Sequence, residues 1–347
     1  MQPINTALLS FGMSGQVFHA PFLDTVEGFN LYAVWERSKN TASSIYPEIK
    51  TYRTLEETLA DPAVELVVVN TPNATHFAYA RKALLAGKHV VVEKPFTVTS
   101  EEAEELIGLA ATNNLVLSVY QNRRFDSDFK AVKKIVEEGW LGNIAEAEFH
   151  YDRFKEELSP KVHKETPGPG TGALYDLGSH LIDQALQLFG EPEAVFGDLR
   201  KVRPASLVDD YFEILLYYPA LRVRLHSSYL VREALPAYQL HGSKGSFVKA
   251  KTDVQEAALQ EGQRPVGSAW GKEPEAQQGL LHTENNGQVV RKLIPSPNGH
   301  YGAYYEGIAA AIRDRLTPPV TAEEGRAVIR VIERAIESHH QKRLIPF

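Results

Sequence analysis

The sequence of 347 residues contains no cysteine. This absence excludes disulfide bonds, zinc sites built from thiolates and catalysis by a thiol nucleophile. No apolar stretch approaches the roughly 20 residues that a membrane-spanning helix needs. The amino terminus lacks the basic start and apolar core of a secretory signal. We therefore expect a cytoplasmic protein with no membrane partner.

A long basic run is also missing, and the formal net charge is −7. This charge balance argues against a nucleic-acid partner. Apolar residues make up 43% and charged residues 23% of the chain, which is typical of a globular protein. Because domains usually span about 100–200 residues, the length predicts two domains. No spacing of the histidines requires a metal ion, so no metal site is expected.

Short apolar runs alternate with helical patterns over the first third of the chain. Strands are expected at residues 7–11, 31–35, 64–69, 88–92 and 115–120. Capping boxes at Thr54 and Thr99 mark the starts of two helices, and Pro21 is expected to stop the short helix after the first strand. Strand–helix alternation of this kind predicts an α/β Rossmann domain with a doubly wound parallel sheet over residues 1–122.

The regular alternation of strands and helices ends at about residue 122. Strand-like runs follow one another closely at residues 194–199, 211–218, 221–231, 238–241 and 246–249. Closely spaced strands pair antiparallel, so residues 123–347 are expected to form an α+β domain with a large, open, mainly antiparallel sheet. The polar stretch 255–300 is expected to form long loops, and two helices are expected to end the chain.

A glycine-rich turn follows the first expected strand. In the dinucleotide-binding pattern G-x-G-x-x-G, Gly12 and Gly15 match, and Ser10 stands in place of the first glycine. The second glycine lets the backbone approach a pyrophosphate, and the third lets the helix pack on the strand. Because the turn joins a strand to a helix, we expect a bound dinucleotide rather than a plain turn. The expected contacts are Phe11, Gly12, Met13, Ser14 and Gly15.

The second strand ends at an acidic residue. Glu36 can accept hydrogen bonds from the adenosine ribose and repel a 2′-phosphate, which favours NAD. Arg37 follows it, and an arginine at this place can stack on adenine or hold the 2′-phosphate of NADP. A solvated pair of loop charges is a further alternative for both residues. NAD is the expected cofactor, and NADP is the alternative.

Other candidates follow the later strands, at the edge where open α/β sheets bind their ligands. Lys94 comes directly after Glu93 at the end of a buried strand, so its amine is expected at the reacting hydroxyl or carbonyl of a hydride-transfer enzyme. Glu93 and Lys94 are also expected cofactor contacts. The remaining expected cofactor contacts are Thr71, Pro72, Asn73, His76, Gln121 and Asn122. Asn73 or Thr75 would alternatively cap the next helix.

Asp176 and His180 stand four residues apart on a predicted helix and therefore share one face. A carboxylate beside an imidazole can fix its tautomer and raise its basicity, which suits a proton relay. A surface or structural pair is the alternative. Gly178 between them costs about 1 kcal/mol relative to alanine in a helix, which indicates close approach of another group. Tyr120 and Arg123 are further candidates for substrate contact, with an ion pair as the alternative for Arg123.

Together these residues resemble the Gfo/Idh/MocA family of NAD(P)-dependent oxidoreductases over essentially the whole chain. The most specific elements are Glu93-Lys94-Pro95 and Asp176-x-x-x-His180 after a glycine-rich loop. Residues 12–21, 120–125 and 177–180 are most similar to the subgroup that contains NADP-dependent scyllo-inositol dehydrogenase. Glu36 departs from the small or hydroxyl residue of the NADP users in that subgroup, so their cofactor preference does not carry over.

The resemblance implies that Lys94, Asp176 and His180 form the catalytic set. It also implies a second domain whose open sheet mediates formation of a homodimer or homotetramer. We therefore expect hydride transfer between NAD(P) and a hydroxyl carbon of a sugar or cyclitol, a small-molecule substrate that the motifs do not identify. Two alternatives keep the same fold: a dinucleotide-binding regulator without catalysis, and an enzyme that cleaves a C–O or glycosidic bond with a tightly held cofactor.

Overall fold

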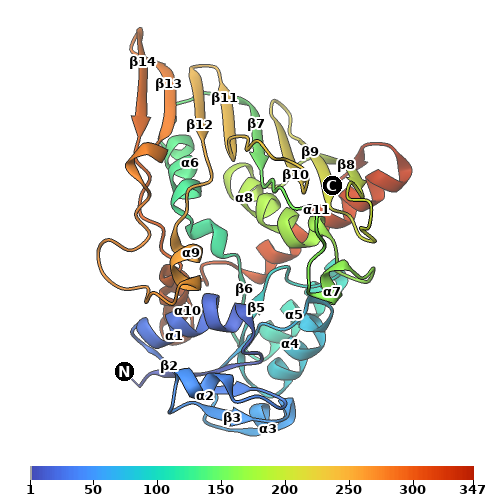
Figure 1. The fold of residues 1–347 in the computed structure, drawn as a ribbon, viewed down its shortest axis with the longest axis vertical. Helices are drawn as coiled ribbons and strands as arrows, with labels where there is room; N and C mark the ends of the chain where they lie inside the picture. Colours follow the sequence, from blue (N-terminus) through green and yellow to red (C-terminus); the bar gives the residue numbers. More distant parts are fainter. Residues whose placement is uncertain (1) are drawn as a thin grey trace. The chain divides into compact units, whose positions relative to one another are not determined.

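The computed structural model describes residues 2–347 (Figure 1). The chain divides into two compact units. The first unit runs to Asn122 and adds Val254–Trp270 and His300–Arg326. The second unit comprises Arg123–Asp253, Gly271–Gly299 and Ala327–Phe347. Both units are therefore discontinuous in sequence, whereas the expected domains, 1–122 and 123–347, are contiguous ranges.

A six-stranded parallel sheet forms the centre of the first unit, in the order β3-β2-β1-β4-β5-β6. The strands are β1 (Ile4–Leu8), β2 (Phe29–Trp35), β3 (Lys50–Tyr52), β4 (Leu66–Val69), β5 (His89–Glu93) and β6 (Leu117–Tyr120). This order is that of a doubly wound dinucleotide-binding sheet, which confirms the predicted fold class. All four residues of β4 are fully buried, as expected for a strand covered on both faces.

Helices and helical turns complete the first unit. They are η1 (Gly15–His19), α1 (Ala20–Thr25), α2 (Thr41–Ile45), α3 (Leu55–Ala60), η2 (Asn73–Thr75), α4 (His76–Leu85), α5 (Ser100–Thr112), α9 (Gln255–Gln260) and α10 (Gly302–Asp314). Both predicted capping boxes are confirmed. The hydroxyls of Thr54 and Thr99 accept the backbone N–H of Glu57 and Glu102, the third residues of their helices. The carboxylates of Glu57 and Glu102 in turn accept the backbone N–H of the capping threonines.

The expectation that Pro21 stops the first helix is wrong. Pro21 lies in the first turn of α1, which continues to Thr25. Proline is tolerated there because the first N–H groups of a helix have no intrahelical acceptor, so the missing donor costs nothing. The preceding turn, η1, is π-helical.

A nine-stranded mixed sheet forms the second unit, in the order β14-β13-β12-β11-β7-β10-β9-β8-β15 (Figure 1). The strands are β7 (Ile144–His150), β8 (Ala194–Arg200), β9 (Tyr211–Tyr217), β10 (Arg222–Ser228), β11 (Tyr238–Gly242), β12 (Gly245–Lys249), β13 (Gly279–Asn285), β14 (Gln288–Ile294) and β15 (Ile345–Pro346). The mainly antiparallel sheet is confirmed. Its one parallel pair among the described strands joins β7 to β10.

Alternation along the strands gives this sheet one buried face. Phe212, Ile214 and Leu216 of β9 are fully buried, whereas the intervening Glu213 and Leu215 are half-buried. The other helices and helical turns are η3 (Asn122–Phe125), α6 (Ser127–Glu137), α7 (Val162–Glu165), η4 (Leu174–Gly178), α8 (Ser179–Phe189), η5 (Glu275–Gln277) and α11 (Ala322–Gln341). No helix of the described residues is long and apolar enough to cross a membrane.

The expectation of long loops over residues 255–300 is wrong. This stretch contains α9 and the hairpin of β13 and β14, whose ends pair at Asn285 and Gln288. Asn286 and Gly287 form the turn, both with positive φ, at 52° and 77°. Asn-Gly is a strong signal for a two-residue hairpin turn. The polar composition of β14, a largely exposed strand, concealed it.

Arg124 anchors η3 within the second unit. Its Nε lies 2.8 Å from Asp183 Oδ2, and its Nη2 lies 2.6 Å from Asp183 Oδ1, and both side chains are buried. A planar guanidinium matches a carboxylate in this two-bond arrangement. Arg124 is therefore held by a buried ion pair with Asp183.

Candidate functional site

The glycine turn of the first unit is closed by its own backbone and by Ser10. Ser10 Oγ accepts the N–H of Gly12 at 3.3 Å, so the residue in place of the first glycine stabilises the turn. A Cβ on Gly15 would lie only 2.4 Å from the carbonyl oxygen of Ser10. This close approach is the one that the third glycine of a dinucleotide fingerprint permits. Gly12 and Met13 are exposed at the tip of the turn.

Glu36 follows β2 and is buried. Its Oε1 accepts the N–H of Thr41 and its Oε2 accepts the N–H of Ala42, both at 3.1 Å. The carboxylate therefore caps the first turn of α2, where negative charge is favourable. Arg37 is exposed in the same loop. The predicted hydrogen bonds from Glu36 to a ribose stay a prediction, and both of its oxygens already have a backbone donor.

The loop after β4 is tied to the loop after β5 by His76. One ring nitrogen of this buried histidine lies 2.8 Å from the carbonyl oxygen of Thr71, and the other lies 2.8 Å from that of Pro95. Burial lowers the pKa of His76, and the two carbonyl acceptors oppose this effect. Thr75 stands at the N-cap of α4, but its hydroxyl donates to the carbonyl of Pro72 and makes no cap bond. His76 thus fixes the shape of two loops at the ligand-binding edge.

Glu93, at the end of β5, is the centre of a hydrogen-bonded cluster. Its Oε1 accepts Ser14 Oγ at 2.5 Å and lies 3.0 Å from His19 Nε2, while its Oε2 accepts the N–H of Lys94 at 3.1 Å. Tyr305 lies 2.6 Å from the other nitrogen of His19. Burial by itself would raise the pKa of Glu93, but the hydrogen bonds from His19 and Ser14 and the nearby Lys94 charge lower it to about 2.

The ionised state of Glu93 sets the direction of the bonds to its carboxylate. An ionised carboxylate only accepts hydrogen bonds, so Nε2 of His19 must carry a proton. Sequence analysis did not connect His19 and Tyr305 with Glu93, because they lie 74 and 212 positions from Glu93 in the chain. Only the fold brings them together.

The residues after β6 contribute buried side chains. The Tyr120 side chain is fully buried, and its hydroxyl donates to the carbonyl of Phe18 at 2.8 Å. Its ring lies 4.5 Å from the His19 ring, centroid to centroid. Tyr120 therefore packs against the His19 ring of the Glu93 cluster. Its predicted contact with substrate stays a prediction. Gln121 and Asn122 are also buried.

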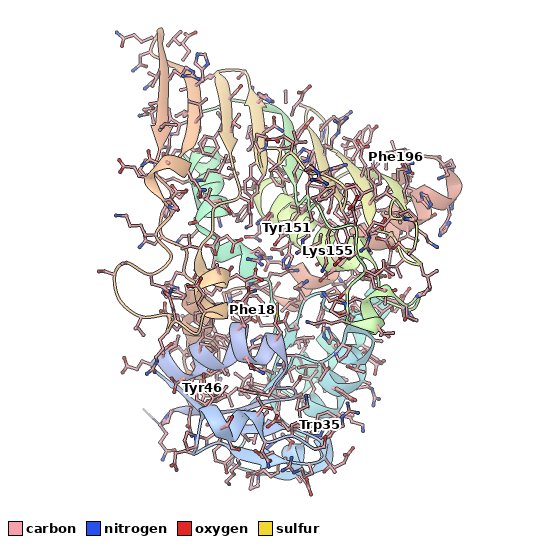
Figure 2. The ribbon with its side chains drawn as sticks, viewed as in Figure 1. Phe18, Trp35, Tyr46, Tyr151, Lys155 and Phe196 are labelled. Carbon is pink, nitrogen blue, oxygen red and sulfur yellow. The ribbon has the colours of Figure 1, made fainter. Side chains whose placement is uncertain are left out.

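Asp176 and His180 lie in the second unit, on the run from η4 to α8. Lys164 Nζ donates to Asp176 Oδ2 at 2.8 Å. The His180 ring is stacked on the ring of Tyr151, with centroids 6.3 Å apart and planes 19° apart. Figure 2 labels Tyr151. A Cβ on Gly178 would lie 2.9 Å from Leu174 Cδ1, which confirms the close approach inferred from that glycine.

Several partners of this pair were missed by the sequence analysis. Lys164 and Tyr151 lie on elements distant from Asp176, and the exposed Arg153 has its guanidinium carbon 5.5 Å from the centre of the Tyr151 ring. Asp209 accepts the N–H of Leu174 at 2.7 Å and so holds the start of η4. Arg123 belongs to the second unit as well, and its Nη1 lies 3.6 Å from Asp126 Oδ1.

Lys94 belongs to the first unit and the Asp176–His180 pair to the second. Each part is ordered by its own neighbours: Lys94 by the Glu93 cluster, and His180 by Tyr151 and the helix. Their joint action in catalysis stays a proposal. The cofactor contacts predicted at residues 11–15, 36–37, 71–73, 76, 93–94 and 121–122 likewise stay predictions.

The depressed pKa of Glu93 predicts how stability depends on pH. The pKa falls from 4.5 to about 2 on folding, so the stabilisation is present above pH 4.5 and is lost as pH falls towards 2. At about 1.4 kcal/mol per unit, Glu93→Gln should lower the free energy of unfolding by on the order of 3 kcal/mol at pH 7. Urea unfolding at pH 7 and pH 4 should show the deficit shrinking by about 1 kcal/mol.

The exposed Glu101 on α5 provides the matched control. Glu101→Gln should have little effect on the unfolding free energy at either pH. A Glu93→Gln deficit that stays the same at pH 7 and pH 4 would show that the carboxylate is not held ionised by its neighbours.

Two family models match this chain. A model described as an oxidoreductase family NAD-binding Rossmann fold matches residues 4–121, and one described as an oxidoreductase family C-terminal alpha/beta domain matches residues 133–347. Among curated proteins, the scyllo-inositol 2-dehydrogenase (NADP(+)) IolW of Bacillus subtilis is 41% identical over 342 residues. The match covers 99% of this chain and 95% of that protein.

Solved structures are also similar to this chain along its whole length. The yvaA protein of Bacillus subtilis has a TM-score of 0.95 and 40% identity, covering 100% of this chain and 99% of its own. A protein of Bacteroides fragilis has a TM-score of 0.91 and 45% identity, covering 100% of both chains. The chain therefore belongs to the Gfo/Idh/MocA oxidoreductase family and is an NAD(P)-binding dehydrogenase or reductase.

Proposed function

We propose that this enzyme transfers a hydride between NADP(H) and a hydroxyl-bearing carbon of a cyclitol or a related sugar. The observation that carries the proposal is the similarity along nearly the whole chain to scyllo-inositol 2-dehydrogenase (NADP(+)). The local geometry supports it. Lys94 lies at the carboxyl end of a buried parallel strand, where open α/β sheets bind their ligands. Asp176 and His180 share one helix run.

In the proposed mechanism, His180 accepts the proton of the substrate hydroxyl, and Lys94 polarises the same oxygen. Asp176 orients the imidazole from four residues away on the helix. The bound nicotinamide supplies the hydride acceptor, and the reverse reduction uses the same residues. Stacking on Tyr151 limits rotation of the His180 ring. The Lys164 ammonium bonded to Asp176 holds the carboxylate in place.

The coenzyme proposal changes the preference that the sequence suggested. Repulsion of a 2′-phosphate by Glu36 was the argument for NAD. The Glu36 carboxylate instead accepts two backbone N–H groups, which neutralise part of its charge. Arg37 is exposed beside it and offers a guanidinium suited to a phosphate. We therefore place NADP(H) first, and NAD(H) becomes the alternative.

Two other functions fit the same fold. A non-catalytic dinucleotide-binding regulator would bind coenzyme without turnover on any polyol, aldose or cyclitol. A redox-assisted enzyme that cleaves a C–O bond would turn over substrate with no net reduction of the coenzyme. The presence of Lys94, Asp176 and His180 together favours hydride transfer over the non-catalytic regulator. A spectrophotometric screen with both coenzymes separates all three.

We also propose that the half-buried face of the nine-stranded sheet joins chains into a homodimer or homotetramer. Phe196, labelled in Figure 2, is the cross-strand partner of Leu215, and each lies between strand neighbours that are buried. A pair of large apolar side chains on an open sheet face is a common association surface.

Replacement of Lys94 tests the catalytic proposal. Lys94→Ala should reduce turnover of scyllo-inositol with NADP(+) by at least about a thousandfold, because one group that acts on the reacting oxygen is lost. NADPH affinity, measured by fluorescence titration, should change by less than about threefold. Lys82→Ala, at an exposed lysine on α4, is the control and should keep full turnover. Turnover retained in Lys94→Ala would refute the assigned role.

Replacement of Arg37 tests the coenzyme proposal. Arg37→Ala should weaken NADPH binding by about tenfold, since a charge-assisted bond to the 2′-phosphate is removed. NADH, which lacks that phosphate, should bind almost as before. Arg81→Ala, an exposed arginine on α4, is the control and should change neither affinity. Equal effects of Arg37→Ala on both coenzymes would place the arginine away from the 2′ position.

The oligomer proposal is tested by introducing a charge on the open sheet face. Phe196→Arg should lower the mass measured by light scattering from a dimer or tetramer towards one chain, because an unpaired cation would be buried in the contact. Leu85→Arg makes the same type of change at an exposed position on α4 and should leave the mass unaltered. A wild-type protein with the mass of one chain would contradict the proposal directly.

A further inference from the structure

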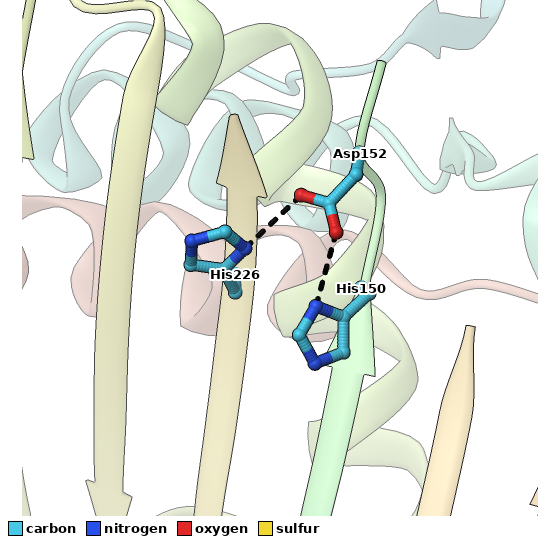
Figure 3. A group of neighbouring side chains, drawn as sticks. All are labelled: His150, Asp152 and His226. Atoms are coloured by element: carbon cyan, nitrogen blue, oxygen red, sulfur yellow. Dashed lines mark hydrogen bonds and ion pairs between the residues drawn. The ribbon is translucent and has the colours of Figure 1, made fainter. Parts of the chain in front are cut away.

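Three metal-ligating side chains meet at the end of the parallel strand pair in the second unit. The register of β7 and β10 places His150 beside His226. Asp152, two residues after His150, lies on the same side of the extended chain. Its Oδ2 is 3.1 Å from His150 Nδ1 and its Oδ1 is 3.0 Å from His226 Nδ1 (Figure 3).

The donor set is that of a transition-metal site. It offers two imidazole nitrogens and one carboxylate, with the candidate ligand atoms within 4.8 Å of one another. Ligands bound at about 2.0–2.2 Å to a shared ion lie roughly 3–3.5 Å apart, so the two measured separations need little change. Two histidines and one carboxylate hold first-row divalent ions and leave coordination positions open for water.

Neighbouring groups orient these ligands. The N–H of Ser228 donates to Asp152 Oδ1 at 3.0 Å, which fixes the carboxylate between the two rings. Glu148 Oε2 lies 3.5 Å from Nε2 of His150, the nitrogen that faces away from Asp152. Glu148 is thus at ion-pair distance from the outer nitrogen of His150, the side on which a metal-ligating histidine usually has a carboxylate or carbonyl.

Burial and charge are also compatible with an ion. His150 is 9% exposed, and His226 and Asp152 are half-buried, so the cluster is partly shielded within the single chain. The nearby Arg224 is engaged elsewhere. Its Nη1 lies 3.4 Å from Glu148 and its Nε lies 3.1 Å from Glu213. Asp152 keeps a negative charge for an incoming cation.

We propose that His150, Asp152 and His226 bind one divalent first-row transition-metal ion per chain, of the Zn²⁺ class. The proposal is independent of the proposed hydride transfer. The ion would link β10 to the segment after β7, which carries Tyr151 between two of the ligands. Because the Tyr151 ring stacks on His180, an ion bound here would fix the chain on both sides of that contact.

Isothermal titration of the chelator-treated full chain with ZnCl₂ tests the site. We expect one ion per chain, and no binding of Mg²⁺ or Ca²⁺ under the same conditions, because imidazole disfavours hard cations. Asp152→Asn and His226→Gln should each weaken Zn²⁺ binding by at least about tenfold. His282→Gln and His340→Gln, at exposed histidines elsewhere, are the matched controls and should bind as the wild type does.

Circular dichroism of the ion-free variants checks that each one is folded. Co²⁺ added to the wild type gives a test that needs no variant, since imidazole and carboxylate ligation produces visible d–d absorption bands that Zn²⁺ should abolish by displacement. No Zn²⁺ binding, binding that Asp152→Asn and His226→Gln both leave intact, or absence of the Co²⁺ bands would overturn the proposal. If only His282→Gln or His340→Gln lost Zn²⁺ binding, the ion would belong to surface histidines, and the proposed site would likewise be refuted.

Discussion

The buried carboxylate of Glu93 is the interaction on which the first unit depends. It accepts the Ser14 hydroxyl from the glycine turn, lies against His19 from the π-helical turn, and accepts the N–H of Lys94. A carboxylate can be buried only when its lone pairs are satisfied. Its position therefore fixes the turn proposed to hold the pyrophosphate and the lysine proposed to act on the substrate. One buried group thus ties coenzyme site and catalytic residue to a single framework.

In the second unit, the register between strands β7 and β10 positions the side chains of the two proposed sites. The parallel pairing of β7 with β10 extends beyond the end of β7, where Tyr151 and Arg153 still donate N–H groups to His226 and Ser228 of β10. That extension places Tyr151 against His180 and places Asp152 between two histidines. Because side chains alternate along an extended chain, Tyr151 and Asp152 point to opposite sides. The same short segment can therefore serve the proposed active site and the proposed metal site.

Regular local signals made much of the fold predictable. Capping boxes at Thr54 and Thr99 and the apolar run of β4 gave correct elements, since each depends only on neighbouring residues. Errors arose where local rules have two outcomes. Pro21 can end a helix or lie in its first turn, and a polar stretch can be a loop or, as in β13 and β14, an exposed hairpin. For Glu36, the pattern after the second strand located the carboxylate but not the backbone N–H groups of α2 that it accepts.

The sequence by itself determined the fold class, the family and the candidates Lys94, Asp176 and His180, because motifs of adjacent residues carry that information. Only the tertiary structure decided which distant groups surround them. His19 and Tyr305 meet Glu93, and His226 meets His150 and Asp152, through strand order and register. These contacts join residues more than 70 positions apart. No local spacing encodes them, because the distance between such residues depends on how the whole sheet is assembled.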